Sequence, residues 1–215
     1  MRGDGLPDPR AAPSGRDVVA LCGPLTPDLA LAGYRRGLFA MELAAGVNAW
    51  FSPDPRGVIP LSGLRVSRSL RRSLTTFAVT TDTAFDAVLD ACADPARPGA
   101  WINVEYRRVY RSLHSRGAAH SVEVWRDGQL AGGLIGVEQG GLFCGETMFH
   151  RQTDASKVAL VALVQRLASA PGAGRLLDVQ WWTPHLGSLG AVAVPRDDYL
   201  DLLPQALRLP PVREW

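Results

Sequence analysis

Apolar residues recur at helical spacing in several stretches of the chain, and the clearest of these follows residue 155. Side chains three or four positions apart form one apolar face there, at Val158, Leu160, Val161, Leu163, Val164 and Leu167, as in an amphipathic helix. Thr153 or Asp154 is suited to cap the start of this helix. Comparable patterns predict helices at residues 27–35, 64–74, 82–92, 101–113, 156–168 and 197–203, the last stopped by Pro204.

Strands are predicted where short apolar or alternating runs lie between turn residues. Asp127 and Gly128 separate two such runs, which is the pattern of a β-hairpin. The first predicted strand contains Pro60, which cannot donate to a ladder, so we expect it at the edge of a sheet. The predicted strands cover residues 58–61, 77–81, 120–125, 130–137, 141–147 and 176–182.

The order of these elements predicts an α+β fold with one central sheet and helices on its faces. The first 62 residues differ, because they are rich in prolines and aromatic residues. In this part we expect a loose segment up to residue 18, a turn region at residues 38–41 and a rigid irregular segment at residues 49–57 that presents Arg56. The chain is therefore expected to form a small N-terminal domain at residues 1–62 and a second domain at residues 63–215.

Composition narrows the classes of protein to consider. The chain has 215 residues, of which 47% are hydrophobic and 20% charged, as in an ordinary globular core. It has no apolar run of about 18 residues, so no membrane span is expected, and no secretory signal pattern. Its three cysteines, Cys22, Cys92 and Cys144, lack C-x-x-C spacing, which argues against a disulfide framework and a cysteine zinc site. A cytoplasmic location is the simplest expectation.

Motifs that bind cofactors are absent from the sequence. The four histidines show no H-x-x-x-H or H-x-E spacing, so no metal site is expected. Neither a phosphate-binding G-x-x-x-x-G-K-[ST] loop nor a dinucleotide-binding G-x-G-x-x-G motif occurs. We therefore expect no metal, ATP or dinucleotide cofactor.

Positive charge is concentrated locally, since the net charge is only +2. One patch suited to phosphate lies on the predicted helix at residues 64–74 and consists of Arg65, Arg68, Arg71 and Arg72. A second consists of Arg107, Arg108 and Arg111. Trp101 is a candidate for stacking on a base. The alternative for each patch is a solvated helix face, which is the usual role of a charge run.

Asp178 and Gln180 lie two residues apart on a predicted buried strand, so the strand period places both on one face and Leu177, Val179 and Trp181 on the other. Two buried polar side chains are costly unless each has a partner. They are candidates for a catalytic relay in which Asp178 holds Gln180 and the Gln180 amide oxygen faces an amine or hydroxyl. A structural hydrogen-bonded pair is the alternative.

Glu146 is a second candidate, because it lies among glycine and large apolar residues. It is suited to receive a substrate amine; a salt bridge to Lys157 or an arginine is the alternative. Lys157 is the only lysine of the chain, and a role at a substrate and a role in anchoring its turn both stay open. The neighbouring apolar residues could line a ligand pocket or form plain core: Leu134, Phe143, Met148, Leu160, Leu163 and Leu167.

Several short motifs occur in a fixed order along the chain: LAGYRRGLFAM at 31–41, WFSPDPR at 50–56, FCGETMF at 143–149, ASKVAL at 155–160, LDVQ at 177–180, TPH at 183–185 and SLGA at 188–191. Together they closely resemble the bacterial leucyl/phenylalanyl-tRNA–protein transferases. The resemblance extends from about residue 21 to residue 203. Each motif alone is weakly specific, but the ordered set is highly specific.

The resemblance implies an aminoacyltransferase of the N-degron pathway, which marks proteins for degradation. Such an enzyme takes Leu or Phe, with Met as a further candidate, from an aminoacyl-tRNA and places it on a protein whose N-terminus is Arg or Lys. It needs no cofactor because the aminoacyl ester is already activated. The implied fold is a small N-terminal domain followed by a GNAT-like mixed-sheet domain, the fold of the acyl-CoA N-acyltransferases.

The resemblance also implies roles for particular residues. Asp178 and Gln180 match the family's catalytic pair. Trp101 would stack near the terminal adenosine, and the patch of Arg65, Arg68, Arg71 and Arg72 would hold the tRNA acceptor stem. The implied pocket for the aminoacyl side chain consists of Leu134, Phe143, Gly145, Glu146, Met148, Leu160, Leu163 and Leu167. The chain departs from the family's usual residues at Met41, Ile135 and Thr147.

Two alternatives from other classes remain. A CoA-dependent N-acetyltransferase would need a Q/R-x-x-G-x-G/A loop before a helix, to bind the pyrophosphate. The sequence has no such loop, and Asp154 stands where the phosphates would lie. An RNA-binding module without chemistry would leave the Asp178 and Gln180 pair without a task.

Overall fold

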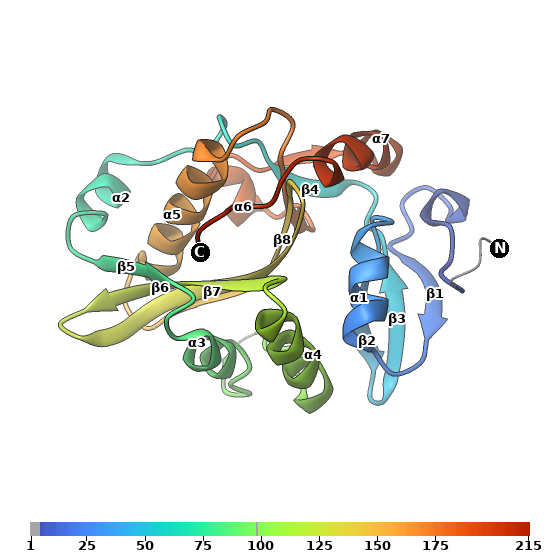
Figure 1. Ribbon diagram of the computed structural model, residues 1–215, viewed down its shortest axis with the longest axis horizontal. Helices are drawn as coiled ribbons and strands as arrows, with labels where there is room; N and C mark the ends of the chain where they lie inside the picture. The colour runs from blue at the N-terminus through green and yellow to red at the C-terminus, as the bar shows by residue number, and fades with distance from the viewer. Residues whose placement is uncertain (1–4, 98) are drawn as a thin grey trace.

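The computed structural model describes residues 5–97 and 99–215 and contains two sheets (Figure 1). A three-stranded sheet has the order β1-β3-β2, and a seven-stranded sheet has the order β10-β4-β9-β8-β7-β6-β5. The helices are α1 (Pro27–Tyr34), α2 (Arg68–Ser73), α3 (Phe85–Cys92), α4 (Val104–Ser115), α5 (Ala155–Ser169), α6 (Pro184–Ser188) and α7 (Arg196–Leu207). The strands are β1 (Val18–Cys22), β2 (Phe39–Ala44), β3 (Val47–Phe51), β4 (Arg56–Ile59), β5 (Ala78–Thr81), β6 (Ala119–Arg126), β7 (Gln129–Gln139), β8 (Leu142–His150), β9 (Leu176–Gln180) and β10 (Val192–Val194).

The predicted α+β class is confirmed by the larger sheet, which is mixed. Its strands pair antiparallel except for β8 and β9, which run parallel. Helices α2 and α5 cover one face, and α3 and α4 cover the other (Figure 1). The predicted hairpin forms β6 and β7, with its turn at Asp127 and Gly128. No helix within the described residues is long and apolar enough to span a membrane.

The N-terminal sheet was missed by the sequence patterns. The expected turn region at residues 38–41 is wrong, because Phe39–Ala44 is a strand, and most of the aromatic segment before Ser52 is strand β3. Trp50 packs against α1 so closely that a Cβ at Gly33 would lie 2.6 Å from its ring. The loose segment expected before residue 18 contains a 3₁₀ turn at Pro9–Ala11, and its residues 1–4 lie outside the described part.

Strand β4 corrects a second prediction. It lies between β10 and β9 and is therefore not an edge strand. Pro60 follows its last residue, so the missing N–H costs the ladder nothing. Because β4 comes from the first 62 residues, the larger sheet draws on chain from before the predicted domain boundary. The division at residues 62 and 63 stays a prediction.

Three helix ends differ from expectation. Helix α2 begins at Arg68 and is shorter than the predicted helix at 64–74. Asp154 precedes α5 but has a left-handed backbone with φ of 67° and makes no capping hydrogen bond. Pro204 does not stop α7, which continues to Leu207. The buried face of α7 at Tyr199, Leu203 and Ala206 spans the proline, and this packing offsets the one missing backbone bond.

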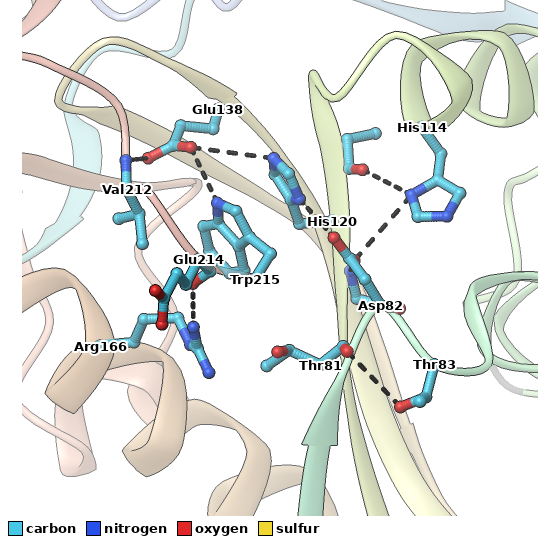
Figure 2. A network of polar contacts seen from close by, with 12 residues as sticks. Thr81, Asp82, Thr83, His114, His120, Glu138, Arg166, Val212, Glu214 and Trp215 are labelled. Carbon is cyan, nitrogen blue, oxygen red and sulfur yellow. Dashed lines mark hydrogen bonds and ion pairs between the residues drawn. The ribbon is translucent and has the colours of Figure 1, made fainter.

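The C-terminal segment packs on the α5 face of the sheet (Figure 2). The indole of Trp215 stacks on His120 with 4.2 Å between ring centroids, and its Nε1 donates to Glu138 Oε2 at 2.9 Å. His120 Nδ1 also lies 2.7 Å from Asp82 Oδ2. Burial raises the pKa of Glu138. This network joins strands β6 and β7 to the end of the described chain.

Candidate active site

A cavity of about 310 Å³ lies where β8 and β9 diverge. The parallel ladder between these strands ends at Cys144 and Asp178, so the following residues of each strand face the cavity instead of each other. The lining is almost wholly apolar, and its wall consists of Phe39, Met41, Trp101, Leu134, Ile135, Gly145, Glu146, Thr147, Met148, Leu160, Leu163, Leu177, Val179, Gln180, Trp181, Thr183 and Leu186. This size and composition are typical of a ligand site.

The structure brings six of the eight predicted pocket residues together around this cavity: Leu134, Gly145, Glu146, Met148, Leu160 and Leu163. Phe143 and Leu167 are buried but do not line it. Phe143 stacks on Trp215 instead, with ring centroids 5.3 Å apart (Figure 2 shows Trp215). Spacing along a strand or helix identifies buried positions but cannot tell a cavity wall from filled core.

Asp178 lies directly behind the cavity wall and is fully buried. Arg56 holds it with two hydrogen bonds, from Nε to Oδ1 at 2.9 Å and from Nη2 to Oδ2 at 2.6 Å. Tyr199 donates its hydroxyl to Oδ2 at 2.8 Å. The expectation that Arg56 is presented at the surface is therefore wrong, since its side chain is 1% exposed. Burial works against the charge of Arg56, but the carboxylate of Asp178 raises its pKa overall.

Gln180 reaches the cavity because the strand turns at this residue. Its backbone is left-handed, with φ of 58°, and its N–H donates to Asp178 Oδ1 at 2.9 Å. This turn breaks the period-two alternation, so Leu177, Val179, Gln180 and Trp181 all line the cavity. The period-two pattern of the sequence had predicted Gln180 on the opposite face of the strand from the other three residues.

The polar arrangement of the pair also differs from the expected relay. The oxygens of Asp178 bond Arg56, Tyr199 and the backbone of Gln180, and no described contact joins them to the Gln180 side chain. The Gln180 amide nitrogen is buried and has no hydrogen-bond partner among the described residues. Asp178 therefore fixes the backbone of Gln180, while the Gln180 amide remains free to meet a ligand in the cavity.

Glu146 is the one carboxylate in the cavity wall. Tyr34 donates to Oε1 at 2.8 Å and Tyr110 to Oε2 at 2.6 Å. The two tyrosines replace the salt bridge considered from the sequence. Burial raises the pKa of Glu146 to about 7, although the tyrosine hydrogen bonds act in the opposite direction. A carboxyl group that titrates near neutrality is suited to bind or exchange protons with a substrate amine.

Glu146→Gln is expected to change how stability depends on pH. The raised pKa means that the folded wild type holds a proton which the unfolded chain loses above its ordinary pKa of 4.5. Wild-type stability should therefore fall as pH rises toward 7, by about 3 kcal/mol in total. The variant lacks this loss, so its stability relative to wild type should increase between pH 5 and pH 7 in urea unfolding. A difference that stays constant across this range would contradict the assignment.

Trp101 and the arginine patches lie in different places. Trp101 lines the cavity and packs edge-on against Tyr106 at 5.3 Å. The side chains of Arg65, Arg68, Arg71 and Arg72 are exposed on and before α2, away from the cavity wall. In the second patch, Arg107 bonds Asp90 at 3.1 Å and Arg111 bonds Asp86 at 2.7 Å. These pairings make the second patch less suited to phosphate than the first.

Lys157 stabilises its own turn, which is one of the two roles left open by the sequence. Its Nζ donates to Asp154 Oδ1 at 2.9 Å, and Ser73 donates to the other oxygen of Asp154 at 3.0 Å. The pKa of Asp154 is lowered, mainly by the hydrogen bond from Lys157. Across residues 5–97 and 99–215, no group of three or more His, Cys, Asp or Glu side chains is arranged to hold a metal ion.

Comparison with known proteins identifies the chain. The family model described as leucyl/phenylalanyl-tRNA protein transferase matches residues 58–204. A protein of that name from Herpetosiphon aurantiacus is 47% identical over 187 residues, covering 86% of this chain and 95% of its own. One from Salmonella heidelberg is 43% identical over 217 residues, covering 98% and 91%. Among solved structures, a GCN5-related N-acetyltransferase from Kribbella flavida is 12% identical with a TM-score of 0.44, covering 79% of this chain and 61% of that one.

The fold, its cavity and the extent of these matches define the class of protein as an aminoacyltransferase, which transfers an amino acid from tRNA to a protein. The chain belongs to the leucyl/phenylalanyl-tRNA–protein transferase family.

Proposed function

We propose that this enzyme transfers Leu or Phe from aminoacyl-tRNA to the α-amino group of proteins that begin with Arg or Lys, and so marks them for degradation through the N-degron pathway. Met is a further donor residue to consider. One observation carries the proposal: an apolar cavity with one carboxylate, Glu146, and one unpartnered amide, Gln180, in its wall.

The reaction forms a C–N bond and breaks a C–O bond. The α-amine of the protein attacks the ester carbonyl, and the proton that the amine loses ends on the released 3′-hydroxyl of the tRNA. Deprotonating the amine requires little work, since its free pKa is about 8. The Gln180 amide is suited to orient the amine through its oxygen and to stabilise the developing oxyanion through its nitrogen. Most of the rate would come from this positioning.

The cavity wall supports a preference for Leu and Phe. Leu134, Leu160 and Leu163 would surround an apolar side chain that is unbranched at Cβ. A β-branched side chain would clash near the mouth, a shape discrimination of about 1–3 kcal/mol. Glu146 would receive the α-amino group of the aminoacyl residue.

Trp101 would stack near the terminal adenosine, and the exposed arginines at positions 65, 68, 71 and 72 would contact acceptor-stem phosphates without reading sequence. The alternative donor, a CoA thioester, is disfavoured by Asp154. This carboxylate precedes α5, where a pyrophosphate would meet the helix N-terminus, and it already binds Lys157 and Ser73 there. If the protein were an RNA-binding module without catalytic activity, the cavity and the Gln180 amide would have no function.

The test offers labelled Phe-tRNA, or labelled acetyl-CoA, together with a peptide that begins with Arg. We expect label on the peptide from the tRNA alone. The double variant Arg68→Glu, Arg71→Glu should raise the KM for tRNA and leave kcat unchanged. It should also reduce the slope of log KM against log salt concentration by about one for each phosphate that the variant no longer binds. Arg208→Glu, at an exposed arginine near the end of α7, is the matched control. Transfer from acetyl-CoA, or no transfer from either donor, would contradict the proposal.

A further inference from the structure

Within residues 5–97 and 99–215, strand β2 has a neighbour on one side only. In the order β1-β3-β2 it pairs with β3 and leaves its other edge unpaired. Phe39 and Met41, in the first half of this strand, line the cavity, and the strand then continues outward to Ala44. An open strand edge therefore starts at the proposed site of amine attack and leads away from it.

The backbone groups on this edge can be assigned from the ladder. Ser52 donates its N–H to Asp17, on the side of β1. Because successive residues of a strand alternate in direction, Ala49 and Phe51 face β2, where their partners are Met41 and Phe39. Ala40 lies between these two β2 residues and Glu42 follows Met41. Both therefore direct their N–H and C=O groups to the free edge.

No described hydrogen bond outside the ladder engages the main chain of Ala40 or Glu42. Ala40 is nonetheless only 7% exposed, and unpaired backbone groups at such a position are costly unless a partner meets them. The Glu42 carboxylate does not bond these edge groups, because it accepts hydrogen bonds from Gly46 N and Asn103 Nδ2. The outer end of the strand is open, with Leu43 49% exposed.

We propose that the residues following the first residue of the protein substrate bind as an added strand along the free edge of β2. Main-chain hydrogen bonds suit this partner, because substrates defined by their first residue share no sequence beyond it. At about 3.3 Å per residue, the edge from Ala40 to Glu42 has room for a short extended segment, and a register shift between Glu42 and Ala44 ends the regular part of the strand. This inference rests on the proposed function, and its test is arranged to fail separately from it.

The test is a scan of acceptor peptides that begin with Arg and carry one N-methylated amide at each of the next five positions in turn. N-methylation removes a donor and adds bulk, so it blocks pairing only where the amide faces β2. We expect the KM for peptide to rise about three- to tenfold at alternate positions, with unchanged kcat and unchanged KM for tRNA. The intervening positions are the internal control.

Glu42→Pro supplies the enzyme-side arm, because it removes an N–H directed to the free edge and spares the β3 ladder. The matched control is Leu21→Pro, at an exposed residue of β1, on the opposite edge of the same sheet. Glu42→Pro should raise the KM for peptide, and Leu21→Pro should not. Equal effects at all peptide positions, no effect at any, or equal effects of the two prolines would overturn the inference. If Glu42→Pro does not fold, the peptide scan alone decides. Failure of the wild type to modify the unmethylated peptide would instead overturn the proposed function.

Discussion

Arg56→Met is expected to destabilise the protein by about 3–5 kcal/mol, because it leaves the carboxylate of Asp178 buried without its countercharge. Asp178 is 0% exposed, so water cannot replace the guanidinium. The variant would also lack the hydrogen bond that Arg56 Nη1 donates to the carbonyl of Gly37 at 3.0 Å. Urea unfolding at neutral pH measures the change.

The double variant Arg56→Met, Asp178→Leu is the control for this interpretation. Removing both charges together should recover most of the stability, since replacing a buried pair with apolar residues is often nearly neutral. A double variant as unstable as the single one, or a single variant within about 1 kcal/mol of wild type, would contradict the assigned role of the pair.

Gln180→Ala is expected to lower the rate of single-turnover transfer about 10²-fold or more, because the amide is the uncommitted polar group in the cavity wall. The left-handed backbone at residue 180, with φ of 58°, carries a Cβ in the wild type and in the alanine variant alike, so this substitution adds no backbone strain. Gln180→Gly removes the same amide together with the Cβ, and glycine adopts this conformation freely, so both variants should lose the same activity. Gln165→Ala, at an exposed amide of α5, is the matched control and should transfer normally.

Full transfer by Gln180→Gly would show that the amide has no part in the reaction. A loss of rate in both variants with unchanged unfolding behaviour supports the proposed contact with the reacting atoms.

The sequence predicted most of the larger sheet and its helices because their patterns are local. The hairpin of β6 and β7 and the helix α5 follow from a turn signal and an apolar repeat. The three-stranded sheet was not predictable in this way. Its strands are short, β2 and β3 contain aromatic residues, and the sheet is held by contacts with α1 and with the residue after β9, where Phe39 packs edge-on against Trp181 with ring centroids 5.0 Å apart.

The candidate site was predicted in part, for a similar reason. Six pocket residues came from local spacing and the family resemblance, whereas the partner of Asp178 is Arg56, 122 residues away in the chain. Arg56 lies in a segment of prolines and aromatic residues that resembles a surface loop. The left-handed turn at Gln180 also has no local signal, since glutamine is not a residue that favours it.

The most direct measurement offers the enzyme a mixture of all aminoacyl-tRNAs and a peptide that begins with Arg, and then determines the mass and N-terminal sequence of the product. Leu or Phe should precede the original Arg, because in the proposed mechanism the cavity accepts side chains unbranched at Cβ and its polar groups receive the two amines. A peptide that gains Val or Ile as readily as Leu or Phe, or gains the residue elsewhere than on its α-amine, or stays unmodified, would contradict the account.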